Sequence, residues 1–154
     1  MSENLGLGNL DYGFYSGEPI IKLLLDGRNV QIMTCETYTD PDGRVWGIFA
    51  GDLSDGATIP QKLWSVIGGP FEGPYRAGAL FHDRQCNYYK TIEERREGDR
   101  MIRVASLCAG CTVELVDLLF AGVSAGTLQA QMEGRSHGPK AFDVVVPDDP
   151  RGWH

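Results

Sequence analysis

The sequence predicts an α+β domain in which a small N-terminal antiparallel β-meander precedes a helical hairpin and a further buried helix. Short apolar and β-branched segments separated by turn residues give a sheet-like pattern over residues 19–50, and the apolar spacing lengthens to that of helices over residues 60–123. With 154 residues, the chain is long enough to bury one core. We therefore expect a single domain over residues 19–133, with a flexible arm at 1–18 and a C-terminal extension at 134–154.

Three segments rich in apolar and β-branched residues predict the strands of the meander, at 20–25, 30–39 and 45–50. The first two are separated by Asp26-Gly27-Arg28-Asn29, and the last two by Asp40-Pro41-Asp42-Gly43. Both connections have the composition of tight turns, in which Pro presets one backbone angle and Gly adopts positive φ. Short turns of this kind join antiparallel neighbours.

Four helices are predicted after the meander. A short one opens at Pro60 and ends at Gly68-Gly69-Pro70, and a second covers 74–88. The third covers 91–109 and begins with Thr-Ile-Glu-Glu, the pattern of a capping box. The fourth, at 113–123, is so apolar that we expect it to be buried.

Composition excludes several classes of function. A net charge of −7 argues against a nucleic-acid-binding protein, because phosphate contacts need clustered Lys and Arg. No uninterrupted apolar run reaches the roughly 18 residues of a membrane span, so no transmembrane segment is predicted. The N-terminus lacks the basic and apolar regions of a secretory signal, so we expect synthesis in a cytoplasm.

The most informative motif is His82-Asp83, which directly follows the apolar run Ala79-Leu80-Phe81. The second and third helices are joined by a very short connection, which favours antiparallel packing and brings His82 opposite Asp99. A carboxylate bonded to one ring nitrogen leaves the other nitrogen free to take a proton from water. His82 is thus a candidate catalytic base, with Asp99 as the carboxylate that orients it.

Asp83 is a candidate metal ligand. It points about 100° around the helix from His82, and it could hold a hard cation together with backbone carbonyls of the Gly-rich stretch at 68–73. Asp55 is a second candidate ligand; the alternative is an Asx turn in which its side chain bonds nearby backbone. A histidine base, an orienting aspartate and a cation together would make a hydrolase site.

Two alternatives use the same residues differently. In the first, His82 and Asp99 only hold the two helices together and no metal is bound. In the second, a formal zinc set would be His82, Cys86, Cys108 and Cys111. A single C-x-x-C motif is a weak zinc signal, and the sequence favours the four cysteines as small apolar core residues rather than ligands or disulfides.

The run Asp55-Gly56-Ala57-Thr58-Ile59-Pro60, followed by Trp64 and then His82-Asp83, resembles an uncharacterised family encoded by phages and prophages. Its signature is D-G-A-S/T-x-P followed by H-D, and the resemblance covers roughly residues 45–105. It implies a phage or prophage gene, and a virion or lysis-associated protein.

The H-D helix pair also resembles phospholipase A2 enzymes of the bacterial and parvoviral types. This resemblance implies His82 as the base, Asp99 as its orienting carboxylate, Asp83 as a calcium ligand, and a lipid or cell-envelope ester as substrate. The chain differs from those enzymes at Cys86, where they usually have Tyr, and its glycine-rich loop matches theirs only in composition.

Two functions follow as hypotheses. One is a phage-associated ester hydrolase with His82 and Asp99 as its dyad. The other is a non-enzymatic virion component, such as a tail or adaptor protein, which binds other phage proteins or copies of itself. Under either hypothesis the protein is made in the host cytoplasm, and incorporation into the virion is expected of the structural component.

Overall fold

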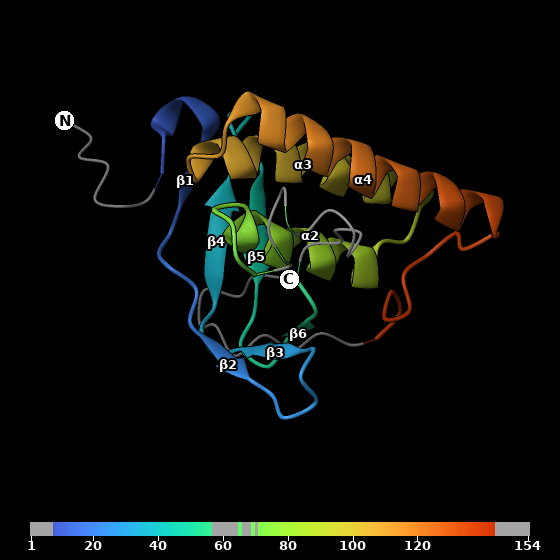
Figure 1. Cartoon of the computed structure of the whole chain (residues 1–154). Coiled ribbons are helices and arrows are strands. Elements are labelled where there is room, and N and C mark those ends of the chain that lie inside the picture. The colour runs from blue at the N-terminus through green and yellow to red at the C-terminus, as the bar shows by residue number, and fades with distance from the viewer. Residues whose placement is uncertain (1–7, 57–64, 66–68, 70, 144–154) are drawn as a thin grey trace.

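The computed structural model describes residues 8–56, 65, 69 and 71–143. Antiparallel strands in two small sheets are followed by three helices (Figure 1). The predicted α+β class, with strands first and helices afterwards, is confirmed.

The strands form two three-stranded sheets rather than one meander. One sheet has the order β1-β4-β5 and the other the order β2-β3-β6. Their bounds are β1 Phe14–Tyr15, β2 Ile21–Leu23, β3 Val30–Ile32, β4 Glu36–Thr39, β5 Val45–Ile48 and β6 Leu53–Ser54. The predicted strand at 30–39 is therefore two strands in different sheets. The turn at Asp40–Gly43 is confirmed, since the Gly43 amide donates to the Asp40 carbonyl at 3.0 Å and Gly43 has φ +88°.

Part of the N-terminal segment is structured, in contrast to the flexible arm expected for 1–18. Leu10–Tyr12 form a 3-10 helix, η1, and β1 pairs with β4. Tyr15 is buried, and its hydroxyl donates to the Ala105 carbonyl at 2.7 Å. This segment thus connects the sheet β1-β4-β5 to the helix that contains Ala105.

The helical hairpin consists of α2 (Arg76–Tyr88) and α3 (Ile92–Cys108). Thr91 caps α3 by accepting from the Glu94 amide, as the capping box predicts, although the Glu94 carboxylate accepts from the Lys90 amide rather than from that of Thr91. A Cβ at Gly78 would lie 3.2 Å from the Ala105 Cβ, so glycine permits the close approach of the two helices. The short helix expected to open at Pro60 lies almost wholly outside the described residues.

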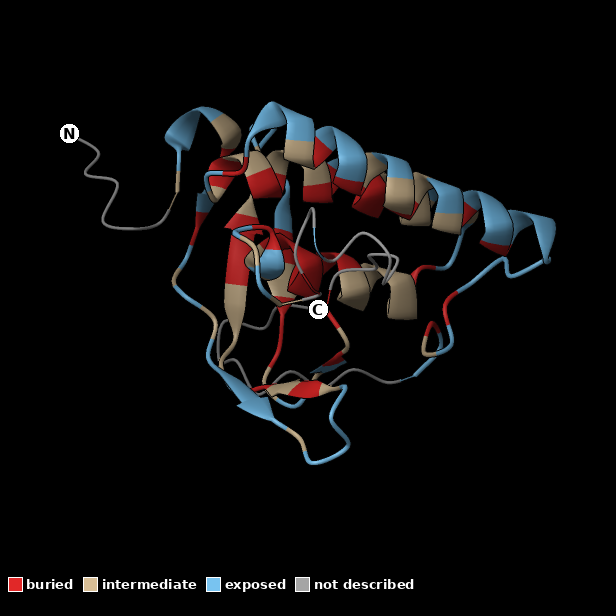
Figure 2. Ribbon diagram, in the orientation of Figure 1, coloured by how far each residue is buried: buried red, intermediate tan, exposed pale blue. Residues whose placement is uncertain are grey.

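Helix α4 (Val113–Met132) is longer and more exposed than predicted. Its inward residues are buried, namely Val116, Leu119, Val123, Thr127 and Ala130. Only 28% of its apolar 18-residue stretch is buried, and its outer side is exposed (Figure 2). The expectation of a buried helix at 113–123 was therefore wrong for its outer side. Among the described helices, α4 has the length and composition of a membrane span, although polar residues interrupt its apolar sequence.

Residues after α4 return to the hairpin. The Gly138 amide donates to the Tyr89 carbonyl at 2.7 Å, and the Lys140 amide donates to the Asn87 carbonyl at 2.8 Å. A Cβ at Gly138 would lie 2.4 Å from the backbone of Asn87, so this contact requires glycine. The first part of the extension at 134–154 is thus packed on the end of α2.

Candidate functional site: a buried histidine-aspartate pair

His82 of α2 and Asp99 of α3 face each other across the hairpin. His82 Nε2 lies 2.8 Å from Asp99 Oδ1, within hydrogen-bond distance. The two residues are 7% and 3% exposed, so both belong to the protein interior. Antiparallel packing of α2 and α3 brings these two candidate residues together.

The pair is part of a network that includes two residues missed by the sequence reasoning. The Thr127 hydroxyl of α4 donates to Asp99 Oδ2 at 2.5 Å, and it accepts from Nε of Arg95 at 3.1 Å. Both carboxylate oxygens of Asp99 are therefore bonded, one to α2 and the other to α4. The signal that could have identified Thr127 is its position as a hydroxyl on the apolar inward stripe of α4.

Cys86 lies one turn after His82 and covers its imidazole. Its Sγ is 3.7 Å from Nδ1 and 3.8 Å from Nε2 of His82. Nearly equal distances mean that the sulfur is not aimed along the lone pair of either nitrogen. Nδ1 is the ring nitrogen that is not bonded to Asp99. It therefore contacts the Cys86 sulfur at a distance near the upper limit for a hydrogen bond to sulfur.

The electrostatic surroundings of His82 favour the charged imidazole. Burial lowers the pKa of His82, whereas the Cys86 sulfur and the Asp99 carboxylate raise it, with a net result well above the ordinary value of 6.5. An imidazolium donates hydrogen bonds but has no lone pair to accept a proton. In this state the pair is an ion pair linking two helices.

Asp83 points to the other side of α2, toward β6. Burial raises the pKa of Asp83 to about 6 and the Asp55 carboxylate adds to that rise, while hydrogen bonds from the Ser54 hydroxyl and the Asp55 amide oppose it. The two candidate cation ligands therefore lie near each other. The Asp55 carboxylate also pairs with Arg28 at 3.2 Å.

The four residues of the formal zinc set do not form one cluster. His82 and Cys86 are in contact, but Cys108 packs in the core cluster beside the sheets, and Cys111 packs in a second cluster with α4. Within the described ranges, no group of three or more His, Cys, Asp or Glu side chains is arranged to hold a metal ion.

Arg84 is a further half-buried charge that sequence reasoning missed. Its guanidinium pairs with Asp52 at 2.5 Å and stacks over the rings of Phe49 and Tyr88, at 4.5 and 4.4 Å from their centroids. Asp52 also accepts from the Phe49 amide. These contacts fasten α2 to the loop before β6.

Access to the His82-Asp99 pair is limited. The three cavities at Tyr15, at Trp46 and at Tyr88 are not lined by His82, Asp83 or Asp99. His82 is 7% exposed, and its ring contacts Asp99 and Cys86 of the same hairpin. What the described residues offer is a hydrogen-bonded histidine-aspartate pair inside the fold.

Comparison with known proteins gives a family match without an activity. The family model "Protein of unknown function (DUF1353)" matches residues 30–123, from β3 into α4. Two proteins of Sinorhizobium fredii (strain NBRC 101917 / NGR234) are similar: "Uncharacterized protein y4jT", 48% identical over 32% of this chain, and "Uncharacterized protein y4iH", 31% identical over 57% of it. The aligned regions are only 15% and 36% of those proteins' lengths. No solved structure matches the chain.

We expect Thr127→Val to destabilise the fold by about 1–3 kcal/mol, because it leaves a buried oxygen of Asp99 without its donor while keeping the side chain's shape. Chemical denaturation of the variant and the wild type measures this difference. Thr39→Val is the matched control, since the Thr39 hydroxyl has no hydrogen bond among the described contacts. Equal stability of Thr127→Val and wild type would contradict the role assigned to Thr127.

We expect Asp83→Asn to stabilise the protein above pH 6 and to have little effect near pH 4. Between the ordinary value of 3.8 and the folded pKa of about 6, the folded carboxyl keeps its proton while the unfolded one loses it, so stability falls as pH rises. Melting temperatures measured from pH 4 to 8 test this, with a gain of a few degrees expected at pH 7.5. Asp42→Asn, at an exposed turn, is the control; a variant less stable than wild type at pH 7.5 would refute the prediction.

Proposed function

The chain belongs to the DUF1353 family, and we propose that it is a non-enzymatic assembly component of a phage or prophage particle. The observation that carries this proposal is the outer face of α4, formed by Leu118, Ala121, Ala125, Leu128 and Met132. These residues follow one another at helical spacing, and all five are exposed.

The outer face is unusually apolar for a surface that meets water. Leu118 and Leu128 are 50% and 55% exposed, and no charged residue occurs from 118 to 132. A helix on the surface of a soluble domain ordinarily carries charged residues on its outer side. A contiguous exposed apolar face is typical of a protein-protein or membrane contact.

The buried network supports the same proposal, because it fixes α4 in place. Thr127 lies on the inward side of α4 and is bonded to Asp99 and Arg95 of α3, while Asp99 is bonded to His82 of α2. A face held on a rigid element loses less conformational entropy when a partner binds. His82 and Asp99 would then have a structural role and no metal.

The partner we propose for this face is another protein chain, either a neighbouring phage protein or a second copy. The net charge of −7 disfavours contact with anionic lipid head groups. The phage context rests on the resemblance of the segment Asp55–Pro60 and the His82-Asp83 pair to a phage-encoded signature.

Leu118→Glu combined with Leu128→Glu is expected to leave folding intact and to remove most of the protein from purified particles, because two charges would be buried at the contact. Particles are induced from a strain that carries the gene, and the tagged protein in them is quantified. Leu25→Glu is the matched control, since Leu25 is fully exposed on a turn far from α4. Incorporation of the double variant at the wild-type level would refute the proposal.

A second candidate function is ester hydrolysis, and a specific contact favours it. The bond between Asp99 and Nε2 of His82 fixes the ring so that Nδ1 would be the atom that accepts a proton from water. Asp83 and Asp55, which lie near each other, would be the calcium ligands. Phospholipase A2 enzymes, which the helix pair resembles, act on lipid esters with a histidine base, an orienting aspartate and calcium held by the H-D aspartate and a Gly-rich loop.

For a hydrolase, His82→Gln and Asp99→Asn should each lower ester turnover by at least about 100-fold, the usual contribution of a general base. Activity is measured on p-nitrophenyl butyrate and on phosphatidylcholine vesicles, with millimolar calcium or with a chelator. Thermal melting of each variant shows whether it has folded. If the folded variants and the wild type have the same activity, or none, the hydrolase function is refuted and the assembly proposal stands alone.

A further inference from the structure

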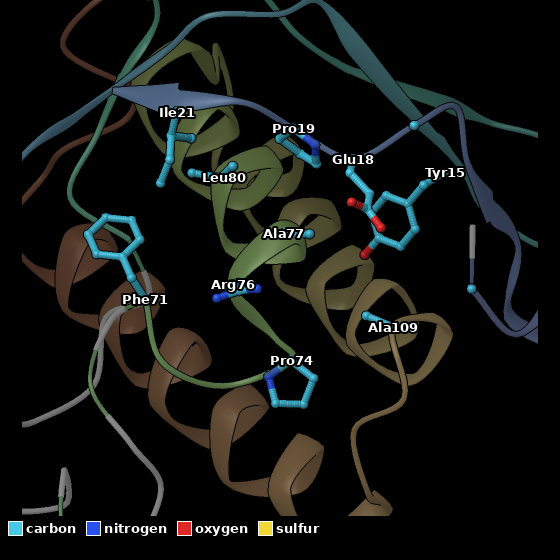
Figure 3. Close-up of a pocket in the computed structure, with 12 residues that line it drawn as sticks. Tyr15, Glu18, Pro19, Ile21, Phe71, Pro74, Arg76, Ala77, Leu80 and Ala109 are labelled. Carbon is cyan, nitrogen blue, oxygen red and sulfur yellow. The ribbon is translucent and has the colours of Figure 1, made fainter. Parts of the chain in front are cut away.

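A cavity separate from the His82-Asp99 pair opens where the segment before β2 passes the start of α2. It has a volume of about 570 Å³, within the range of small-ligand sites. Figure 3 shows Pro19 and Ile21 beside Leu80 at the top of the view, with Phe71, Ala77 and Pro74 below them. Its walls are thus largely aliphatic and aromatic, as expected of a site that takes an apolar body.

Two side chains of opposite charge line this cavity. Arg76 lies at the first position of α2 and Glu18 on the segment that leads to β2 (Figure 3). Both are exposed, and neither forms an ion pair with any residue in the part of the chain that the structure describes. The cavity therefore offers one cation and one anion that the fold does not use.

The position of Arg76 strengthens its pull on an anion. It begins a helix whose N-cap, Tyr75, makes no side-chain capping bond. The Arg76 amide already donates to the Gly73 carbonyl at 3.1 Å, but the N-terminus of a helix still carries a partial positive charge, which favours a carboxylate or phosphate. A carboxylate held there would contact the guanidinium and the helix end together.

Glu18 restricts the ligand further. A purely anionic ligand would meet repulsion from its carboxylate, whereas a ligand with a positive group at its other end would be attracted to both charges. Tyr15 also lines the cavity, but its hydroxyl already donates to the Ala105 carbonyl and adds no free donor. The charges and the apolar walls together fit a zwitterion with an apolar middle.

We propose that this cavity binds a short apolar peptide with free termini, its C-terminal carboxylate on Arg76 and its N-terminal ammonium on Glu18. The side chains of the peptide would lie against Phe71, Leu80 and Ile21. This site lies apart from both the outer face of α4 and the His82-Asp99 pair, so it stands whether or not the functions proposed above are correct.

The tripeptide Leu-Leu-Leu is the probe, used with free termini, as the C-terminal amide and as the N-acetyl form. Binding to the full chain is followed by amide chemical shifts in NMR titrations. Arg76→Gln should weaken binding of the free peptide about tenfold, the effect of losing one charged hydrogen bond, and should change binding of the amide less than twofold. Glu18→Gln should likewise weaken binding of the free peptide about tenfold, and it should change binding of the N-acetyl form less than twofold.

Arg135→Gln is the matched control, because Arg135 is exposed and lies beyond α4. It should leave all three affinities unchanged. Absence of shift changes near Ala77 and Leu80 in the wild type would overturn the proposal. It would also be overturned if Arg76→Gln weakened the free and amidated peptides equally, or had no effect on either.

Discussion

The helical half of this protein depends on one buried carboxylate. Asp99 is 3% exposed, and a charge at that depth is tolerated only when its oxygens are bonded. One oxygen is bonded to His82 of α2 and the other to Thr127 of α4, so a single residue of α3 fixes both neighbouring helices. Removing either partner leaves an unsatisfied oxygen in the core, and for that reason the three helices are expected to hold one arrangement.

This constraint links the interior to the surface. Because Thr127 anchors the inward side of α4, the opposite side of the same helix is held outward, with Leu118 and Leu128 half exposed. An exposed apolar face of this kind is typical of a surface that contacts another molecule, and the assembly proposal assigns that contact to another protein chain. Arg76 and Glu18 lie at a different place, between α2 and the segment before β2, and would serve a separate ligand.

Features encoded in short stretches of sequence could be predicted, and those set by distant contacts could not. The cap of α3 at Thr91 and the turn at Gly43 follow from local chemistry, and the short connection between α2 and α3 was enough to bring His82 opposite Asp99. The segment 30–39 contains no turn residues, yet it is divided between two sheets, because its pairing partners lie elsewhere in the chain. Thr127 was missed because its only local signal, a lone hydroxyl on the apolar inward stripe of α4, does not say which buried group it bonds.

The charge state of His82 tests the central claim most directly. In ¹⁵N NMR spectra of the full chain, His82 is identified by the signal lost in His82→Gln and is followed from pH 5 to 9. We predict that it remains an imidazolium at pH 7.5, with its Nε2 proton hydrogen-bonded and protected from solvent, because it forms an ion pair with Asp99. A neutral ring at pH 7.5, with a pKa at or below 6.5 and an Nδ1 open to water, would contradict the structural role and would favour a catalytic base.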